Sequence, residues 1–96
     1  MSELDNTIHQ PVRLRIMAAL GAIGPREKLE FTFLRDQLEL TDGNLGAHLL
    51  KLEEANYIEV EKTFEKRKPK TLVRMTGRGR DAFAAHVKAL RDILGE

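Results

Sequence analysis

The stretch from Thr41 to Thr76 constrains the fold most, because its apolar residues change from helical to alternating spacing partway along it. Thr41 is a good helix N-cap, and the charge of Asp42 in the first turn complements the helix dipole. Leucines then recur at spacings of four and three, which predicts a helix over about 42–55 with one narrow buried stripe: Leu45, Leu49 and Leu52. Asn56 tolerates the left-handed backbone that ends such a helix.

Two alternating stretches follow that helix, and together they predict an antiparallel hairpin over about 57–76. The first stretch alternates polar side chains with three apolar ones, which is typical of a half-buried strand: Ile58, Val60 and Phe64. The second stretch does the same with Val73 and Met75. We expect the turn at residues 65–70, since Pro69 cannot donate to a strand ladder and suits a tip or an edge.

Positive charge gathers in this hairpin. The whole chain has a net charge of +1, but residues 57–80 carry eight Lys and Arg against three Glu. The cations expected to face a phosphate backbone are those of the hairpin: Lys62, Lys66, Arg67, Lys68, Lys70 and Arg74. A local excess of this size is typical of a surface that contacts a polyanion. The alternative is a solvated hairpin whose lysines protect a sheet edge.

The face of the 42–55 helix opposite its leucines carries small residues, an amide and two charged groups: Gly43, Asn44, Ala47, Lys51 and Glu54. His48 lies at one border of this face and Leu50 at the other. Such a face suits a helix that lies close to a partner, because bulky side chains would hold the partner away. An ordinary solvent face is the alternative. Gly46 costs about 1 kcal/mol relative to Ala inside a helix, and the sequence does not say whether it serves close approach or is neutral drift.

Three further elements are expected around this unit. Pro11 is favourable at a first helical position, and apolar residues at helical spacing predict a helix over about 11–22: Ile8, Val12, Ile16, Leu20 and Ile23. Residues 29–31 alternate and predict a short strand. Thr32 is then expected to cap a helix that carries four apolar residues: Phe33, Leu34, Leu38 and Leu40.

The last helix, expected over about 77–94 behind a Thr76 cap, has a wide apolar face. Its central stripe is Phe83, Val87, Leu90 and Leu94, bordered by Ala82, His86, Ala89 and Ile93. A chain of 96 residues with no Trp and 5% aromatic residues builds only a small core, so an additional subunit interface would stabilise it. We therefore expect a homodimer through Phe83, Val87, Leu90, Ile93 and Leu94; burial within one subunit is the alternative.

Taken together, these residues resemble the short, stand-alone winged helix-turn-helix regulators of the MarR-like and ArsR-like superfamily. The resemblance runs from Ile8 to Leu94 and is carried by Pro11–Met17, by Thr41–Leu45 with His48-Leu49 and Lys51–Ala55, by Tyr57–Lys62 and by Thr71–Thr76 with Gly79-Arg80 and Ala82-Phe83. Asn56 replaces the usual glycine. Gly46 replaces a common serine, which removes any phosphate hydrogen bond from that side chain.

The resemblance implies a single domain over residues 1–96 of the mostly helical α+β class, with a two- or three-stranded antiparallel wing and a C-terminal dimerisation helix. It implies a homodimer that binds double-stranded DNA at a near-palindromic operator. Its recognition helix would place six residues at the major groove: Thr41, Gly43, Asn44, Ala47, His48 and Lys51. The wing would lie against the backbone or the minor groove. A winged helix that binds protein or RNA is the alternative. RNA is disfavoured, since no aromatic pair lies on the strands expected to be exposed.

Other functions find little support in the residues. Cysteine is absent, and the only serine is Ser2, at an end that we expect to be flexible. His9, His48 and His86 fall on three separate expected elements, so we expect no catalytic site, no metal and no cofactor. The N-terminus resembles no signal peptide and no run is long enough to span a membrane, so we expect a soluble, cytoplasmic protein. A small-molecule effector is compatible with the resemblance, but no residue specifies one.

Overall fold

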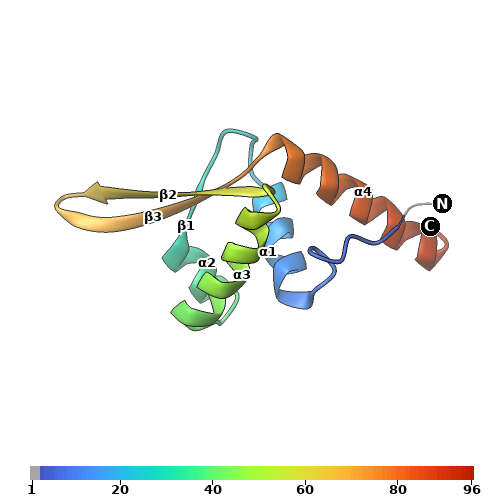
Figure 1. Cartoon of the computed structure of the whole chain (residues 1–96), viewed down its shortest axis with the longest axis horizontal. Coiled ribbons are helices and arrows are strands. Elements are labelled where there is room, and N and C mark those ends of the chain that lie inside the picture. The colour runs from blue at the N-terminus through green and yellow to red at the C-terminus, as the bar shows by residue number, and fades with distance from the viewer. Residues whose placement is uncertain (1–2) are drawn as a thin grey trace.

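A computed structural model describes residues 3–96 of the chain. Its elements follow the order α1 Pro11–Gly21, β1 Leu29–Glu30, α2 Phe31–Gln37, α3 Asp42–Glu54, β2 Ile58–Glu65, β3 Lys68–Met75 and α4 Gly77–Leu94. Helices α1 to α3 gather at the centre of the molecule, the β2–β3 hairpin extends from one side and α4 extends from the other (Figure 1). The mostly helical α+β class and the expected order of elements are confirmed.

The three strands form an antiparallel sheet in the order β1-β3-β2. Ile58 pairs with Met75 at the inner end of the hairpin, and Leu29 of β1 pairs with Val73 of β3. Side chains alternate along each strand, so the inner halves of β2 and β3 point one row of residues toward the helices. Ile58, Val73 and Met75 are accordingly at most 2% exposed. The hairpin is therefore anchored by its inner half.

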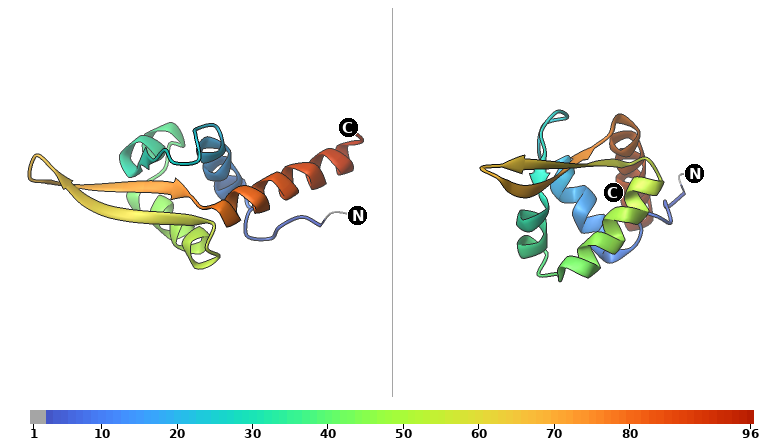
Figure 2. Two further views of the ribbon diagram at one scale, coloured as in Figure 1. Left: turned by 90° about the horizontal axis from the view of Figure 1, so that it is seen from above. Right: turned by 60° about the vertical axis from the view of Figure 1, so that its left-hand side comes forward.

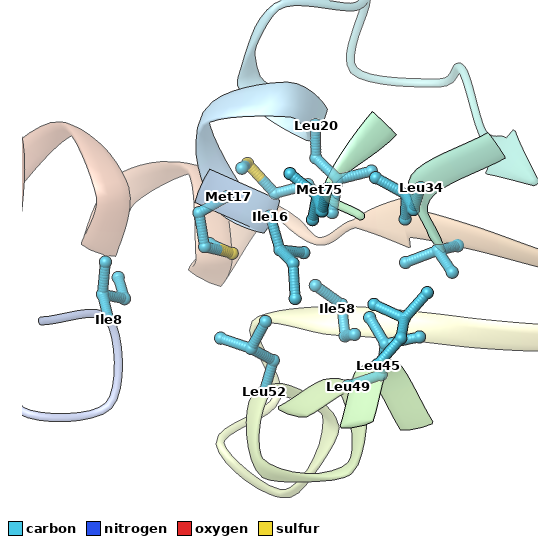
Figure 3. Close-up of a cluster of buried hydrophobic side chains, with 12 residues drawn as sticks. Ile8, Ile16, Met17, Leu20, Leu34, Leu45, Leu49, Leu52, Ile58 and Met75 are labelled. Carbon is cyan, nitrogen blue, oxygen red and sulfur yellow. The ribbon is translucent and has the colours of Figure 1, made fainter. Parts of the chain in front are cut away.

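The core lies where α1, α2, α3 and the inner part of the sheet meet (Figure 3). Its fully or almost fully buried side chains include Ile16, Met17, Leu20, Leu34, Leu45, Leu49, Leu52, Ile58, Val73 and Met75. The predicted leucine stripe of α3 is confirmed, because Leu45, Leu49 and Leu52 are all buried. Burial of this stripe fixes the rotation of α3 about its axis and leaves the opposite face open.

The start of α4 is fixed to the junction between α3 and β2. As predicted, Thr76 caps α4: its hydroxyl accepts from the backbone N–H of Gly79 at 2.9 Å and donates to the carbonyl oxygen of Asn56 at 2.7 Å. Asn56 has a φ of 62°, as expected for a left-handed helix end. Gly79 lies so close to Tyr57 that a Cβ atom would collide with the Tyr57 carbonyl oxygen. Only glycine permits this approach.

Helix α2 differs from the prediction at both ends. It begins at Phe31, directly after β1, and its N-cap is Glu30, so the expectation that Thr32 caps it is wrong. The helix ends at Gln37, and Leu38 and Leu40 lie beyond it. Strand β1 ends at Glu30, where it pairs with β3, and the helix begins two residues earlier than local signals suggest. Glu39 then takes a φ of 55°, which turns the chain toward α3.

The hairpin turn is shorter than predicted. It consists of Lys66 and Arg67 alone, with φ values of 51° and 67°, so β2 and β3 continue to Glu65 and Lys68. Two central residues with positive φ match the right-handed twist of the strands, which favours this tight connection. The longer hairpin projects past the helices, and Phe64, predicted to be half-buried, is 74% exposed. The expectation for Phe64 is wrong because no helix reaches that far along the strand.

The N-terminal segment packs along α4 and buries a histidine there. The backbone N–H of Asp5 donates to Nδ1 of His86 at 3.1 Å, and the Asp5 carboxylate accepts from the Tyr57 hydroxyl. His86 is 1% exposed, and its Nε2 has no hydrogen-bond partner in the described part of the chain. The ring of His9 lies 5.3 Å from that of His86, centroid to centroid. This packing joins the N-terminal segment, α4 and the start of β2.

Burial lowers the pKa of His86 below its usual 6.5, the nearby charge of His9 lowers it further, and Asp5 opposes the shift only in part. Folded His86 therefore resists a proton that the unfolded chain binds. We expect the free energy of unfolding to fall as the pH decreases below about 6.5, and chemical denaturation across that range measures it.

His86→Asn retains an acceptor for Asp5 but removes the titration, so it should flatten the pH dependence. The pKa of His48 is also lowered, by burial and by Arg13, and any slope left in the variant belongs to this second histidine. His48→Gln is therefore the control. An unchanged slope in His86→Asn would contradict the prediction. Asp5 does not interfere, because its pKa lies below 3.8 and it titrates at lower pH.

Candidate nucleic-acid interface

The open face of α3 is the first part of the candidate interface. The hydroxyl of Thr41 accepts from the backbone N–H of Asn44 at 3.1 Å, which confirms Thr41 as the N-cap. Four of the residues expected to face a partner are exposed: Gly43, Asn44, Ala47 and Lys51. Because the leucine stripe points into the core, these positions share the opposite side of the helix. The structure thus brings together the face that the sequence singled out.

His48 occupies a different environment from these exposed positions. It is half-buried, and its Nδ1 lies 3.3 Å from Nη1 of Arg13 on α1. Arg13 in turn donates from Nε to the carbonyl oxygen of Thr7 at 2.5 Å. Burial and the charge of Arg13 lower the pKa of His48, which favours the neutral ring. His48 therefore connects α3 to α1 at the border of the open face.

Arg35 holds the N-terminus of α3, a role that the sequence analysis did not assign. Its guanidinium lies 3.0 Å from the carboxylate of Asp36 and 2.9 Å from that of Asp42, the first residue of α3. Hydrogen bonds to these two carboxylates raise the pKa of Arg35 above its ordinary value. The contact spans the turn between α2 and α3. A favourable N-cap sequence marks Asp42, but only the folded turn shows its partner.

The cations of the hairpin divide into two groups. Lys70 pairs with Glu65 and with Glu30 at 3.1 Å, and Arg74 pairs with Glu59 at 2.6 Å. The other four make no ion pair with residues 3–96: Lys62, Lys66, Arg67 and Lys68. The uncompensated charge is therefore concentrated toward the tip, where Lys66 and Arg67 form the turn. This distribution leaves the tip as the strongest electrostatic feature of the wing.

A groove of about 380 Å³ separates α3 from the wing. Helix α3 contributes Gly46, Leu50 and Glu53 to its lining, and β2 contributes Val60 and Lys62. Phe31 of α2 adds to the apolar lining. Figure 2 shows α3 and the hairpin from two further directions. Thr71 of β3 completes the lining, so the residues of the groove come from four separate elements and no local pattern in the sequence marks it. We call it the α3–wing groove.

Helix α4 leaves its C-terminal end uncovered. Phe83, Val87 and Leu90 are half-buried, whereas Ile93 is 67% and Leu94 69% exposed. His86 and Ala89, expected only at the border of the apolar stripe, are instead each 1% exposed. The N-terminal segment packs on that side of α4, which shifts the buried face away from the predicted stripe. Much of the stripe therefore remains accessible.

The three histidines, considered in the sequence as possible metal ligands or catalytic residues, do not lie together at one site. His48 packs against α1, and only His9 and His86 lie together. Within residues 3–96, no group of three or more His, Cys, Asp or Glu side chains is placed to hold a metal ion. Ser2 lies outside the described residues. Across the same part of the chain, the helices are too short or too polar to span a membrane.

A winged helix domain consists of three helices, two of which form a helix-turn-helix, and a charged β-hairpin. Here α1, α2 and α3 are the three helices, α2 and α3 form the helix-turn-helix, and β2 and β3 form the hairpin. The family model described as "Winged helix DNA-binding domain" matches residues 12–94. The chain therefore belongs to the winged helix DNA-binding domain family.

The chain is also similar to individual proteins. An uncharacterized protein of Methanocaldococcus jannaschii is 42% identical over 76 residues, which is 79% of each chain. The structure of a transcriptional regulator homologue from Pyrococcus horikoshii superposes with a TM-score of 0.85 at 31% identity, over 95% of this chain and 87% of the other. NolR of Sinorhizobium fredii shares the fold, with a TM-score of 0.66 at 22% identity over 94% and 79% of the two chains.

The free cations of the wing tip predict a specific loss of DNA affinity. Replacing Arg67 and Lys68 together by Ala should leave the thermal stability almost unchanged, because exposed charges contribute little to folding. The same change should weaken binding to every duplex and reduce the log–log salt slope by about two units, since each cation that meets a phosphate releases counterions. Fluorescence anisotropy at several salt concentrations measures both effects.

The control removes the same charge from another surface. Arg26 and Lys28 precede β1, and Lys28 pairs with Glu61, which points away from the face of β2 that carries Val60 and Lys62. The double replacement Arg26→Ala and Lys28→Ala should leave the salt slope nearly as in the wild type. An equal slope in the wing variant and the wild type would show that the wing does not contact DNA.

Proposed function

We propose that this chain is a transcriptional regulator that binds a near-palindromic operator in double-stranded DNA as a homodimer. The observation that carries the proposal is the open face of α3, which presents an amide and a cation among small residues. Beside it lies a wing with four cations that form no ion pair within residues 3–96. Membership of a DNA-binding family supports the same partner. The wing supplies sequence-independent attraction to phosphates, and α3 supplies discrimination between bases.

In this proposal α3 lies in the major groove. Asn44 is in the first turn of α3, where its amide can accept from and donate to an adenine edge. Gly43 and Ala47 allow the helix to approach, and Lys51 reaches a guanine edge or a phosphate farther along. Thr41 caps the helix at the start of the face, and His48 lies at one border of it. The division of roles follows from side-chain length, since short residues lie nearest the bases.

The wing would lie along the flanking backbone. Arg67 occupies the turn itself, so its guanidinium is the group best placed to enter a minor groove. Lys62, Lys66 and Lys68 would face phosphates. Lys70 and Arg74, which are paired with carboxylates of the same sheet, would contribute less to the local field.

Dimerisation would use the uncovered stripe of α4, built from Phe83, Val87, Leu90, Ile93 and Leu94. Figure 1 shows α4 extending away from the central helices, so its end is free to meet a second copy. A two-fold pair of α4 helices would present two α3 helices to successive major grooves of a palindromic site. In the single chain, Ile93 and Leu94 expose apolar surface to water. Pairing of α4 with a second copy would bury this surface.

Replacing Asn44 by Ala should narrow the affinity gap between operator and unrelated DNA. A bidentate contact between an amide and adenine contributes about 1–3 kcal/mol of discrimination, so specificity should fall by that amount while the fold is unchanged. Titration of a duplex from the region upstream of the chain's own coding sequence, beside an unrelated duplex, measures the gap. Asn6→Ala removes an exposed amide from the N-terminal segment and serves as control. Equal losses on both duplexes would make Asn44 a positioning residue.

Sedimentation equilibrium tests the homodimer directly. The wild type should have twice the 10.9 kDa chain mass at micromolar concentration, and Leu90→Glu should shift it toward the monomer. Leu94→Glu should do the same without unfolding, because Leu94 is 69% exposed in the single chain. Ala85→Glu, on the opposite side of α4, is the matched control and should remain dimeric. A monomeric wild type would contradict the prediction.

A further inference from the structure

The outer end of the wing carries an exposed apolar pair. Phe64 of β2 lies directly opposite Pro69 of β3 in the strand register, so the two side chains share one face of the hairpin. Phe64 is 74% exposed, the highest value among the large hydrophobic residues of the described chain. The hairpin projects past the helices at this point (Figure 1). The core therefore gives no reason for a phenyl ring at position 64.

The ring of Phe64 lies on the side of the sheet against which the helices pack. Side chains alternate along β2, so Phe64 shares its face with Lys62, Val60 and the buried Ile58. Val60 and Lys62 lie beside α3. Phe64 continues their row outward, beyond the last helix. A ligand that contacts both the open face of α3 and the wing would therefore meet this ring.

Cations surround the apolar pair. Lys62 lies two residues before Phe64 on the same face, Lys66 and Arg67 form the turn, and Lys68 begins β3. These four cations make no ion pair with residues 3–96. A second copy of the wing would meet like charge here and be repelled. A polyanion that also offers an apolar surface suits the site, and DNA does so through the stacked faces of its bases.

We propose that Phe64 is a wedge that enters the minor groove and opens one base step, so that the regulator kinks its operator. This role rests on the proposed function, in which the wing lies against the minor groove. Apolar side chains that insert between base pairs from the minor groove partly unstack them and bend the duplex by about 20–90°. The cations beside Phe64 would bind the phosphates that flank the opened step and offset the cost of unstacking.

The hairpin holds the ring in a suitable position for this task. The turn consists of Lys66 and Arg67 alone, so Phe64 and Pro69 form the last pair on this face before the tip. Proline fixes its own backbone φ and restricts the strand opposite the ring. The inner half of the hairpin is anchored in the core. A short, regular hairpin of this kind loses little conformational freedom when its ring is inserted.

A wedge makes the deformability of DNA part of the operator's specificity. Pyrimidine–purine steps such as TA and CA open easily, whereas A-tracts are stiff. The wild type should therefore bind a duplex with a TA step beneath the wing several-fold more tightly than one with an A-tract there. Phe64→Ala should reduce this preference, because it removes the group that opens the step.

Energy transfer between dyes at the two ends of a duplex measures the kink, and the duplex comes from the region upstream of the chain's own coding sequence. Phe64→Ala should leave this duplex straighter than the wild type does. It should also bind about tenfold more weakly, because stacking of the ring on a base is lost. Its melting temperature should change little, since Phe64 is 74% exposed. Phe64→Leu keeps an apolar wedge and should retain part of the bend.

Two comparisons separate the wedge from the charge of the wing. Phe64→Ala should leave the salt slope unchanged, because a phenyl ring releases no counterions, whereas the double replacement of Arg67 and Lys68 should lower it. Phe33→Ala is the matched control. Phe33 belongs to α2 and is 49% exposed, so its replacement removes a ring of the same kind from outside the wing. This variant should bend the duplex as the wild type does.

Fluorescence detects the insertion directly. The chain has no tryptophan, so Phe64→Trp introduces a single indole. Its emission should be quenched when the duplex binds, because the ring stacks on a base, and the emission of Phe33→Trp should not. In a second measurement, 2-aminopurine replaces successive adenines of the duplex. Its emission should rise beneath the wing when the wild type binds, since unstacking relieves its quenching, and Phe64→Ala should abolish the rise.

The outcomes distinguish the wedge from the proposed function. If the wild type binds the operator without bending it, or if Phe64→Ala bends it equally, Phe64 is no wedge. The proposed function would then stand on wild-type binding and on the Asn44 variant. If the wild type binds no duplex, both proposals fail. If Phe64→Ala instead loses binding to phosphatidylserine vesicles while DNA bending is unchanged, the apolar pair is a membrane contact and the wedge is wrong.

Discussion

Burial of the leucine stripe of α3 is the constraint on which the candidate interface depends. Leu45, Leu49 and Leu52 pack against α1, α2 and the inner strands, and together they allow only one rotation of the helix. Loss of that packing would cost several kcal/mol, because each leucine is almost completely removed from water. The open face of α3 is therefore a consequence of the core. Its residues need no contacts of their own to be correctly placed.

The wing is held in place differently from α3, because only one end of it is packed in the core. Its inner end is held by Ile58, Val73 and Met75 in the core, whereas its outer half has only the strand ladder and the two-residue turn. Exposed charge costs little there, so cations can accumulate at the tip without affecting the fold. Rigid attachment at one end and free charge at the other suit an element that must reach a partner. The same separation explains why Phe64 is exposed although it continues an alternating pattern.

The junction at Tyr57 joins α3 and the wing to α4. Gly79 packs against the backbone of Tyr57, Thr76 bonds to Asn56, and the Tyr57 hydroxyl bonds to Asp5. Asp5 also donates to His86, so the N-terminal segment ties α4 to the start of β2. A rigid connection of this kind would transmit the geometry of a dimer at α4 to the spacing of two α3 helices. The wing and α4 thus share one anchor.

The sequence alone determined the elements whose signals are local. Thr41, Thr76 and Asn56 mark helix ends through their own hydrogen bonds and backbone preferences, and the leucine spacing predicts both the helix and its exposed face. The local excess of Lys and Arg over residues 57–80 likewise indicated the position of the wing. The start of α2, the exposure of Phe64, the ion pairs of Lys70 and Arg74, and the burial of His86 depended on segments distant in the chain. The α3–wing groove belongs to this second group, because its walls come from four elements. Local patterns encode helices and strands through nearest-neighbour geometry, whereas a surface shared by several elements exists only after they pack together.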